Sequence, residues 1–174
     1  MRSANVSSSP LQPQITIRRA TADDANGIAE IYNAEVLNFT STMDMVPRTI
    51  DDNVNGFKAA QSIQCRRRCD TSSGAVVGFA ALSKYKERAA YSTTVEDSVY
   101  VDRKHHGRGI GQLLLSAICD TAREGGFHSV IARIEATGEG SIALHRSVGF
   151  EMIGIERQVG RKFNRWLDVA VMQL

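Results

Sequence analysis

Residues 91–111 read YSTTVEDSVYVDRKHHGRGIG and combine three local patterns. The first part, residues 91–101, is β-branched and aromatic, which predicts a strand with two carboxylates in its middle. A basic, glycine-rich turn follows at 102–109. Beyond it, apolar residues at helical spacing predict an amphipathic helix. The expected buried face of that helix consists of Ile110, Leu113, Leu114, Ala117 and Ile118.

Further strands are predicted on both sides of this stretch, where short β-branched or apolar runs occur. They are expected at residues 15–18, 74–83, 129–134, near 151–159 and at 165–173. No internal repeat or linker separates them from the helical segments. Residues 15–174 are therefore expected to form one mixed α/β domain.

Three further helices are predicted. Thr21 and Asp24 form a capping-box signal, and apolar residues at helical spacing follow over 28–39. A second helix is expected from near residue 49 to about 63, and a short one over 141–148.

The composition is typical of a soluble globular protein. Of the 174 residues, 43% are hydrophobic and 23% are charged, which is enough for one buried core. A net charge of +2 gives no reason to expect nucleic acid or a membrane as a partner. Three cysteines and no leading hydrophobic run indicate a reducing compartment, so we expect a cytoplasmic protein.

Two segments are expected to lack regular structure. Residues 1–14 are rich in Ser, Pro and Gln, which predicts a disordered tail. Cys65 and Cys69 enclose three arginines, but no second pair of ligands matches them. We therefore interpret residues 65–69 as a solvated basic loop, and we expect no metal.

The glycine-rich turn is suited to binding an anion. Glycines let the backbone approach a ligand, and the N–H groups at a helix start point toward it with the positive end of the dipole. Arg103, Lys104 and Arg108 add positive charge. A plain turn with a solvated basic rim is the alternative interpretation. The turn matches neither a Walker loop nor the dinucleotide fingerprint G-x-G-x-x-G.

Several motifs together carry a family resemblance. Residues 106–111 (HGRGIG) resemble the acetyl-CoA signature Gln/Arg-x-x-Gly-x-Gly/Ala of the GNAT acetyltransferase superfamily. Residues 94–101 (TVEDSVYV), 144–150 (LHRSVGF) and 159–169 (VGRKFNRWLDV) are similar to motifs of its phosphinothricin acetyltransferase-like branch. The resemblance covers about residues 15–172.

The resemblance implies a mainly antiparallel sheet of about 6–7 strands flanked by about four helices. It also implies acetyl-CoA as the co-substrate. The implied cofactor-binding residues are Val99, Tyr100, Val101, His106, Gly107, Arg108, Gly109, Ile110, Gly111, Gly138 and Ser141. The chain departs from the branch at His106, at Gly138, where relatives usually have Asn, and at Arg146, where they usually have Glu. The change at Gly138 is the one expected to weaken cofactor binding.

Glu96 is the candidate general base. A carboxylate in a β-branched strand is costly unless it is paired or functional, and partial burial would raise its pKa toward a useful value. The resemblance assigns the base to this residue, acting through a water. The alternative is a solvent-facing or edge-strand Glu. Asp97 points to the opposite face and is expected to be structural or solvated.

His145 is the second candidate catalytic residue. It follows Ser141 by four residues, so both lie on one face of the short helix. A lone helix His is more often a structural hydrogen-bonding group. Many members of the superfamily have Tyr here, which protonates the coenzyme thiolate; a His would donate that proton or assist Glu96, and the choice stays open.

The acceptor side is less defined. Arg88 and Tyr91 resemble the substrate-side R-x-A-Y of the branch, and an Arg suits a carboxylate or phosphinate. A surface arginine is the alternative. Phe39 and Met43 are candidates for the acceptor wall, with core packing equally expected.

The predicted function is N-acetylation of a small amino acid or analogue, such as phosphinothricin or methionine sulfoximine or sulfone. It implies a role in resistance to an antibiotic or herbicide. Acetylation of an aminoglycoside, a polyamine or a protein N-terminus is the enzymatic alternative. A non-catalytic acyl-CoA-binding sensor is the other. The branch consists typically of homodimers, so we expect a homodimer.

Overall fold

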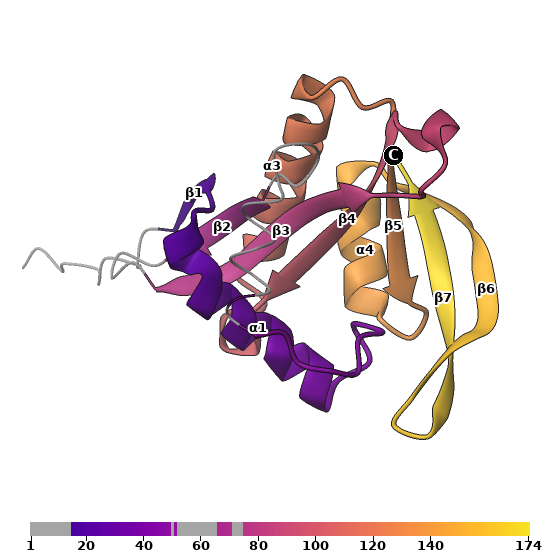
Figure 1. The fold of residues 1–174 in the computed structure, drawn as a ribbon, viewed down its shortest axis with the longest axis horizontal. Helices are drawn as coiled ribbons and strands as arrows, with labels where there is room; N and C mark the ends of the chain where they lie inside the picture. Colours follow the sequence, from indigo (N-terminus) through magenta and orange to yellow (C-terminus); the bar gives the residue numbers. More distant parts are fainter. Residues whose placement is uncertain (1–14, 50, 52–65, 71–74) are drawn as a thin grey trace, which may run out of the picture.

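The computed structural model describes residues 15–49, 51, 66–70 and 75–174 (Figure 1). Of residues 66–70 only the backbone is described. The tail predicted at 1–14 and most of the helix predicted at 49–63 lie outside the described residues.

A seven-stranded sheet forms the centre of the described structure (Figure 1). Its strands are β1 (Thr16–Arg19), β2 (Arg66–Asp70), β3 (Val76–Lys84), β4 (Thr94–Val101), β5 (Ser129–Glu135), β6 (Glu151–Lys162) and β7 (Arg165–Gln173). They lie in the order β1-β2-β3-β4-β5-β7-β6. All neighbouring pairs are antiparallel except β4 and β5, which are parallel. The prediction of a mixed fold with a mainly antiparallel sheet is confirmed.

The prediction of a basic loop at 65–69 is wrong, because residues 66–70 form β2. This strand pairs with β1 on one side and with β3 on the other. Backbone hydrogen bonds to two neighbours hold a strand whatever its side chains are. The run of arginines therefore carried no information about this backbone.

Helices cover both faces of the sheet (Figure 1). They are α1 (Ala25–Asn38), α3 (Ile110–Glu124) and α4 (Glu139–Val148). α1 packs on one face, where Tyr32 meets Phe79 of β3 in a small apolar cluster. α3 packs on the other face, where Leu114 and Ile118 join Val95 of β4 in the larger core. The strand β4 therefore has one face toward α1 and the opposite face toward α3 and α4.

The apolar face of α3 differs slightly from the predicted one. Ile110, Leu114 and Ile118 are buried as predicted, but Leu113 is 49% exposed. Leu115 and Cys119 are buried instead. At 100° per residue, Leu115 and Cys119 widen the buried row on one side, whereas Leu113 lies beyond the opposite edge of the row.

The sheet splits between β4 and β5. Their parallel pairing covers only Thr94 to Glu96, which lies opposite Ile131. Beyond Glu96, β4 continues alongside β3 and β5 continues alongside β7. The β4 edge from Asp97 to Val101 therefore lines a widening gap in the middle of the sheet.

Candidate active site

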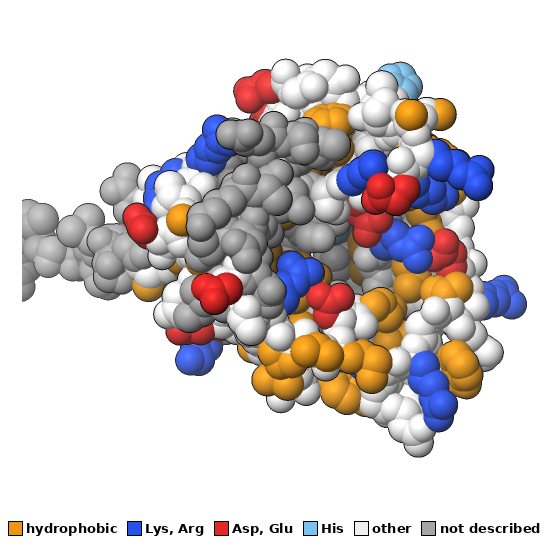
Figure 2. Space-filling model, in the orientation of Figure 1, with side chains coloured by type: hydrophobic (Ala, Val, Ile, Leu, Met, Phe, Trp, Pro, Cys, Tyr) orange, Lys and Arg blue, Asp and Glu red, His pale blue; other side chains and the backbone are white. Residues whose placement is uncertain are grey.

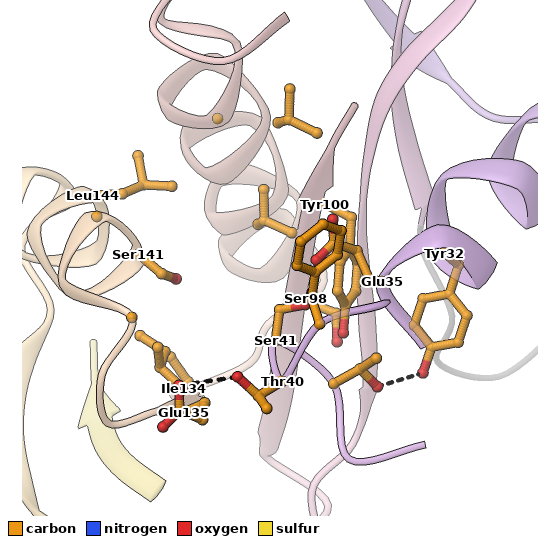
Figure 3. A pocket seen from close by; sticks show the side chains of 18 of the residues that line it. Tyr32, Glu35, Thr40, Ser41, Ser98, Tyr100, Ile134, Glu135, Ser141 and Leu144 are labelled. Atoms are coloured by element: carbon orange, nitrogen blue, oxygen red, sulfur yellow. Dashed lines mark hydrogen bonds between the residues drawn. The ribbon is translucent and has the colours of Figure 1, made fainter. Parts of the chain in front are cut away.

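The gap between β4 and β5 opens into a cavity of about 1160 Å³. Figure 2 shows a hollow near the centre of the molecule, with acidic and basic side chains side by side on its margin. One wall comes from α1 and the segment after it, and the opposite wall comes from α4 (Figure 3). β4, β5 and the glycine-rich turn lie between these walls.

The glycine-rich turn has a backbone that only glycine adopts readily. Gly107 and Gly109 have φ angles of 74° and 75°. A Cβ at either position would have no described atom within 4 Å, so the space beside the backbone is open. α3 begins at Ile110, directly after the turn. Open space, left-handed glycines and a helix N-terminus together suit the pyrophosphate of a coenzyme.

The His106 side chain fixes the turn to β4, and a close approach to α4 follows at Gly111. Nε2 of His106 lies 2.9 Å from the carbonyl oxygen of Val101. A carbonyl only accepts, so Nε2 carries the hydrogen and ties the turn to the end of β4. At Gly111, a Cβ would lie 3.1 Å from the Leu144 side chain, so α3 and α4 approach closely there.

Arg103 does not serve as a free cation in the turn. Its Nε and Nη2 each donate to the Glu35 carboxylate at 2.9 Å. Its guanidinium also lies 3.3 Å from the centre of the Phe39 ring. The positive charge of Arg103, which the sequence suggested for binding a pyrophosphate, is thus paired with Glu35 near the end of α1. Phe39 lies beneath the guanidinium at the cavity wall.

Glu96 lies at the point where β4 and β5 separate, on the α1 face of the sheet. It is half-buried and lines the cavity. Burial raises the pKa of its carboxyl, the positive charge of Arg133 opposes that rise, and the neighbouring Asp97 and Glu156 add to it. A carboxyl group with a raised pKa in a cavity is a good candidate for a general base.

Asp97, the next residue, faces the other side and pairs with His145. Nε2 of His145 lies 3.1 Å from Oδ2 of Asp97, and its Nδ1 lies 2.7 Å from the carbonyl oxygen of Ser141. Both side chains are almost fully buried. Because the carbonyl only accepts, Nδ1 carries a hydrogen, and an ionised Asp97 requires a second hydrogen on Nε2. Burial lowers the pKa of His145, but the Asp97 hydrogen bond and charge outweigh it and raise the pKa.

The N-terminal end of α4 forms the wall opposite α1 (Figure 3). Ser141 and Gly138 line the cavity there. A Cβ at Gly138 would lie 3.0 Å from the carbonyl oxygen of Glu135. Glycine avoids this close approach.

Hydrogen bonds that the sequence did not reveal hold the α1 wall. Thr40 donates to the Glu135 carboxylate at 3.3 Å across the cavity (Figure 3). Lys162, buried in the β6–β7 hairpin, donates to the carbonyl oxygen of Thr42 at 2.8 Å. Burial lowers the pKa of this lysine. The partners are 95 and 120 residues apart, so no local pattern signals them.

Most of the predicted site residues meet at the cavity. Those that line it are Phe39, Met43, Glu96, Val99, Tyr100, Val101, His106, Gly107, Gly109, Ile110, Gly111, Gly138, Ser141 and His145. The ring of Tyr100 packs toward α1 against Phe79 and Tyr32 rather than into the gap. Arg108, in the turn, is exposed and is not among the lining residues.

Arg88 and Tyr91 also lie away from the cavity lining. Residues 89–91 form a short 3-10 helix before β4. The Tyr91 ring packs edge-on against Tyr85, with Lys86 close to both rings. Within one chain neither Arg88 nor Tyr91 is placed to meet an acceptor in this cavity, so their acceptor role stays a prediction.

Residues 17–171 match the acetyltransferase (GNAT) domain family. The chain belongs to this family. It is 38% identical over 160 residues to the L-methionine sulfoximine/L-methionine sulfone acetyltransferase of Salmonella typhimurium, covering 92% of this chain and 94% of that protein. It is 32% identical over 164 residues to the phosphinothricin N-acetyltransferase of Streptomyces coelicolor, covering 92% and 96%.

A solved structure of the family agrees with the fold and contains the cofactor. The GNAT superfamily phosphinothricin acetyltransferase of Sinorhizobium meliloti, in complex with acetyl-CoA, superposes with a TM-score of 0.88 at 37% identity. The match covers 92% of this chain and 87% of that one. The resemblance drawn from the motifs is thereby confirmed, and the chain is an acetyl-CoA-dependent acetyltransferase.

The described part of the chain shows neither a membrane-spanning helix nor a cluster of metal ligands. Among the helices of the described part, none is long and apolar enough to cross a membrane. No group of three or more His, Cys, Asp or Glu side chains in that part is arranged to hold a metal ion.

Proposed function

We propose that this acetyltransferase acetylates the amino group of a small α-amino acid or analogue, of the methionine sulfone, methionine sulfoximine or phosphinothricin type. The observation that carries the proposal is the Glu96 carboxylate, half-buried at the split of the sheet and facing the cavity. The relatives named for these acceptors support the acceptor class. Such an activity would give resistance to an antibiotic or herbicide of this type.

The residues around the cavity fit acetyl-CoA, which supplies the acetyl group as a thioester. Gly107 and Gly109 leave room beside the backbone for the pyrophosphate, and the N-terminus of α3 favours negative charge there. The β4 edge at Val99–Val101 lies beyond the last pair with β5. Its backbone N–H groups are our candidates for stabilising the carbonyl oxygen.

Glu96 is proposed as the base that removes the proton of the acceptor's amino group, through a water. The raised pKa strengthens the carboxylate as a base. Holding both substrates in one cavity contributes the larger part of the acceleration.

His145 is proposed as the proton donor for the leaving thiolate, rather than as a base. Nδ1 donates to the carbonyl oxygen of Ser141, and the Asp97 carboxylate beside Nε2 raises the pKa of the ring, which favours its proton-donating form. His145 lines the cavity from α4, so its proton lies on the face of β4 that α3 and α4 cover, opposite the face that carries Glu96.

A polycationic acceptor such as an aminoglycoside or polyamine fits the cavity less well. Glu35 and Asp44 line it, but Arg103 and Arg48 already pair with them. The acceptor wall is therefore less negative than its carboxylates suggest, and a small zwitterion is the better match.

We also propose a cytoplasmic homodimer in which residues 15–174 form the catalytic domain. β6 is an edge strand, and Ile153, Ile155 and Val159 on it are 46–61% exposed. Exposed apolar side chains on a sheet edge are suited to association with a second copy. The odd number of cysteines supports a reducing compartment.

A thiol-release assay with acetyl-CoA and a panel of acceptors tests the acceptor class. The panel contains methionine sulfone, methionine sulfoximine, phosphinothricin, an aminoglycoside, a polyamine and a peptide with a free N-terminus. Release with the amino acid analogues alone supports the proposal. Release only with the aminoglycoside, the polyamine or the peptide contradicts it, and CoA binding without release would favour a sensor.

A further inference from the structure

An α-amino acid places two charges close together in the site. Its carboxylate carbon lies about 2.5 Å from its amino nitrogen, since two bonds of about 1.5 Å separate them. The group that binds the carboxylate must therefore lie beside the base that serves the amine. Arg88, the residue suggested by the sequence, is not among the residues that line the cavity.

Among the residues that the structure describes, four arginines line the cavity, and they differ in their partners. Arg103 is held by Glu35 and Phe39. Arg48 is held by Asp44 and lies over the Tyr32 ring. These two cations are therefore already committed to the α1 wall.

Arg165 is too far along the sheet from Glu96. Gln173 of β7 lies opposite Ile131 of β5, which in turn lies opposite Glu96. Arg165 starts β7, and the strand from it to Gln173 spans roughly 26 Å at about 3.3 Å per residue. An acceptor whose amine lies at Glu96 cannot reach this arginine with its α-carboxylate.

Arg133 lies beside Glu96. It follows Ile131 by two residues on β5, so its side chain is on the same face of the sheet as Glu96. β4 and β5 separate beyond this pair, so Arg133 projects from the β5 edge of the gap, where its side chain lines the cavity together with Glu96. The charge of Arg133 acts on the Glu96 carboxyl, in agreement with this placement.

In the described part of the chain, the hydrogen bonds to Glu156 use only one edge of the Arg133 guanidinium. Nη1 and Nη2 of Arg133 donate to Oε1 and Oε2 of Glu156, at 3.1 and 2.5 Å. A guanidinium has a second edge, formed by Nε and the other hydrogen of Nη2, which also accepts a carboxylate in a two-pronged geometry. The pair is about one-third exposed, so a small anion can approach it.

We propose that Arg133 binds the α-carboxylate of the acceptor through its Nε edge, while Glu156 holds the other edge and orients the guanidinium. This inference rests on the proposed amino acid acceptor. It makes Arg133 a specificity-determining residue and Glu156 a positioning residue. Once bound, the carboxylate offsets the charge of Arg133 beside Glu96.

Steady-state kinetics with L-methionine sulfone and its carboxamide test the proposal, because the two acceptors differ only at the carboxyl group. The wild type is expected to prefer the acid. Arg133→Gln is expected to raise KM for the acid about 10- to 100-fold, the usual effect of losing a two-pronged ionic contact, with KM for the amide nearly unchanged. Arg133→Lys should restore part of the preference. Glu156→Gln should raise KM for the acid by a smaller factor and lower kcat little.

The matched control is Arg123→Gln at the end of α3, whose ion pair with Asp120 is exposed and away from the cavity lining. It should leave both KM values as in the wild type. An Arg133→Gln variant that keeps the acid preference, or that raises KM equally for acid and amide, overturns the inference while the amino acid function stands. A wild type that acetylates no amino acid in the panel overturns the proposed function itself.

Discussion

The two faces of β4 hold neighbouring carboxylates in opposite situations. Glu96 faces α1 and the cavity, and in the described part of the chain no side chain hydrogen-bonds to its carboxylate. Asp97 faces α3 and α4, where it is buried and paired with His145. The Glu96 carboxylate is thus available to a substrate, whereas the Asp97 carboxylate is used in a hydrogen bond to His145 of α4.

The difference shows how one strand can give two neighbouring carboxylates different roles. Alternation along a strand sends successive side chains to opposite faces. The face of β4 toward α1 carries the half-buried Glu96, whereas the face toward α3 and α4 carries the buried Asp97–His145 pair. Active sites that use one of two carboxyl groups as the base typically hold the two groups in different environments.

Replacing Glu96 by Gln should have the largest effect. The amide keeps the shape of the side chain but cannot take up a proton, so kcat is expected to fall by about 10²- to 10⁴-fold. The affinity for acetyl-CoA, measured by calorimetric titration, should change little, because the turn and the α3 terminus remain intact. Equal losses of rate and cofactor affinity would contradict the role of Glu96 as base.

Replacing Asp97 by Asn tests the other face. The exchange leaves the buried His145 without its counter-ion and is expected to cost about 1–3 kcal/mol of unfolding free energy near pH 6. Because Asp97 raises the folded-state pKa of His145, the stabilisation is fully present below the unfolded pKa of about 6.5. It is lost as the pH rises through the raised folded-state value.

Urea unfolding of both proteins between pH 5 and 9 measures this dependence. The difference in unfolding free energy between wild type and Asp97→Asn should shrink as the pH rises. Asp120→Asn, which breaks an exposed ion pair on α3, is the control and should change stability by less than about 0.5 kcal/mol. A difference that is constant over this pH range would mean that the pair holds no extra proton.

The sequence predicted the cofactor side of this comparison better than the acceptor side. The β4 strand, the turn and α3 are signalled by local patterns of alternation, glycine and helical spacing, and these do not depend on distant residues. Glu96 was found because a carboxylate in a β-branched strand stands out locally. The resemblance added the order of the motifs and the cofactor.

What remained hidden depends on pairs that are distant in the chain. Glu35 meets Arg103 across 68 residues, and Asp97 meets His145 across 48. Nothing in the sequence near Arg103 shows that its charge is already paired. The strand at 66–70 was missed for a related reason, since its neighbours β1 and β3, and not its arginines, determine its conformation.

Gly109→Ala should have a smaller effect than either carboxylate exchange, and on the cofactor alone. The φ angle of 75° costs an alanine about 1–2 kcal/mol, although no described atom would clash with its Cβ. The turn is expected to relax, and KM for acetyl-CoA should rise roughly 10-fold with kcat nearly unchanged. Gly140→Ala, on α4 with equally open space and no positive φ, is the control. A normal KM in Gly109→Ala would show that the left-handed turn is not needed for binding.

Gly138→Asn should have the smallest effect and bears on the departure from the family pattern. The Asn side chain can cap α4, a gain over glycine of only about a few tenths of a kcal/mol, but its Cβ would lie 3.0 Å from the carbonyl oxygen of Glu135. Because a backbone atom must move, we expect the strain to cancel the gain and the change in stability to stay within about 1 kcal/mol. A lowered KM for acetyl-CoA at unchanged stability would show that the amide reaches the cofactor and that glycine weakens binding here. An unchanged KM would show that the backbone of the turn, on the other side of the gap, already supplies the binding.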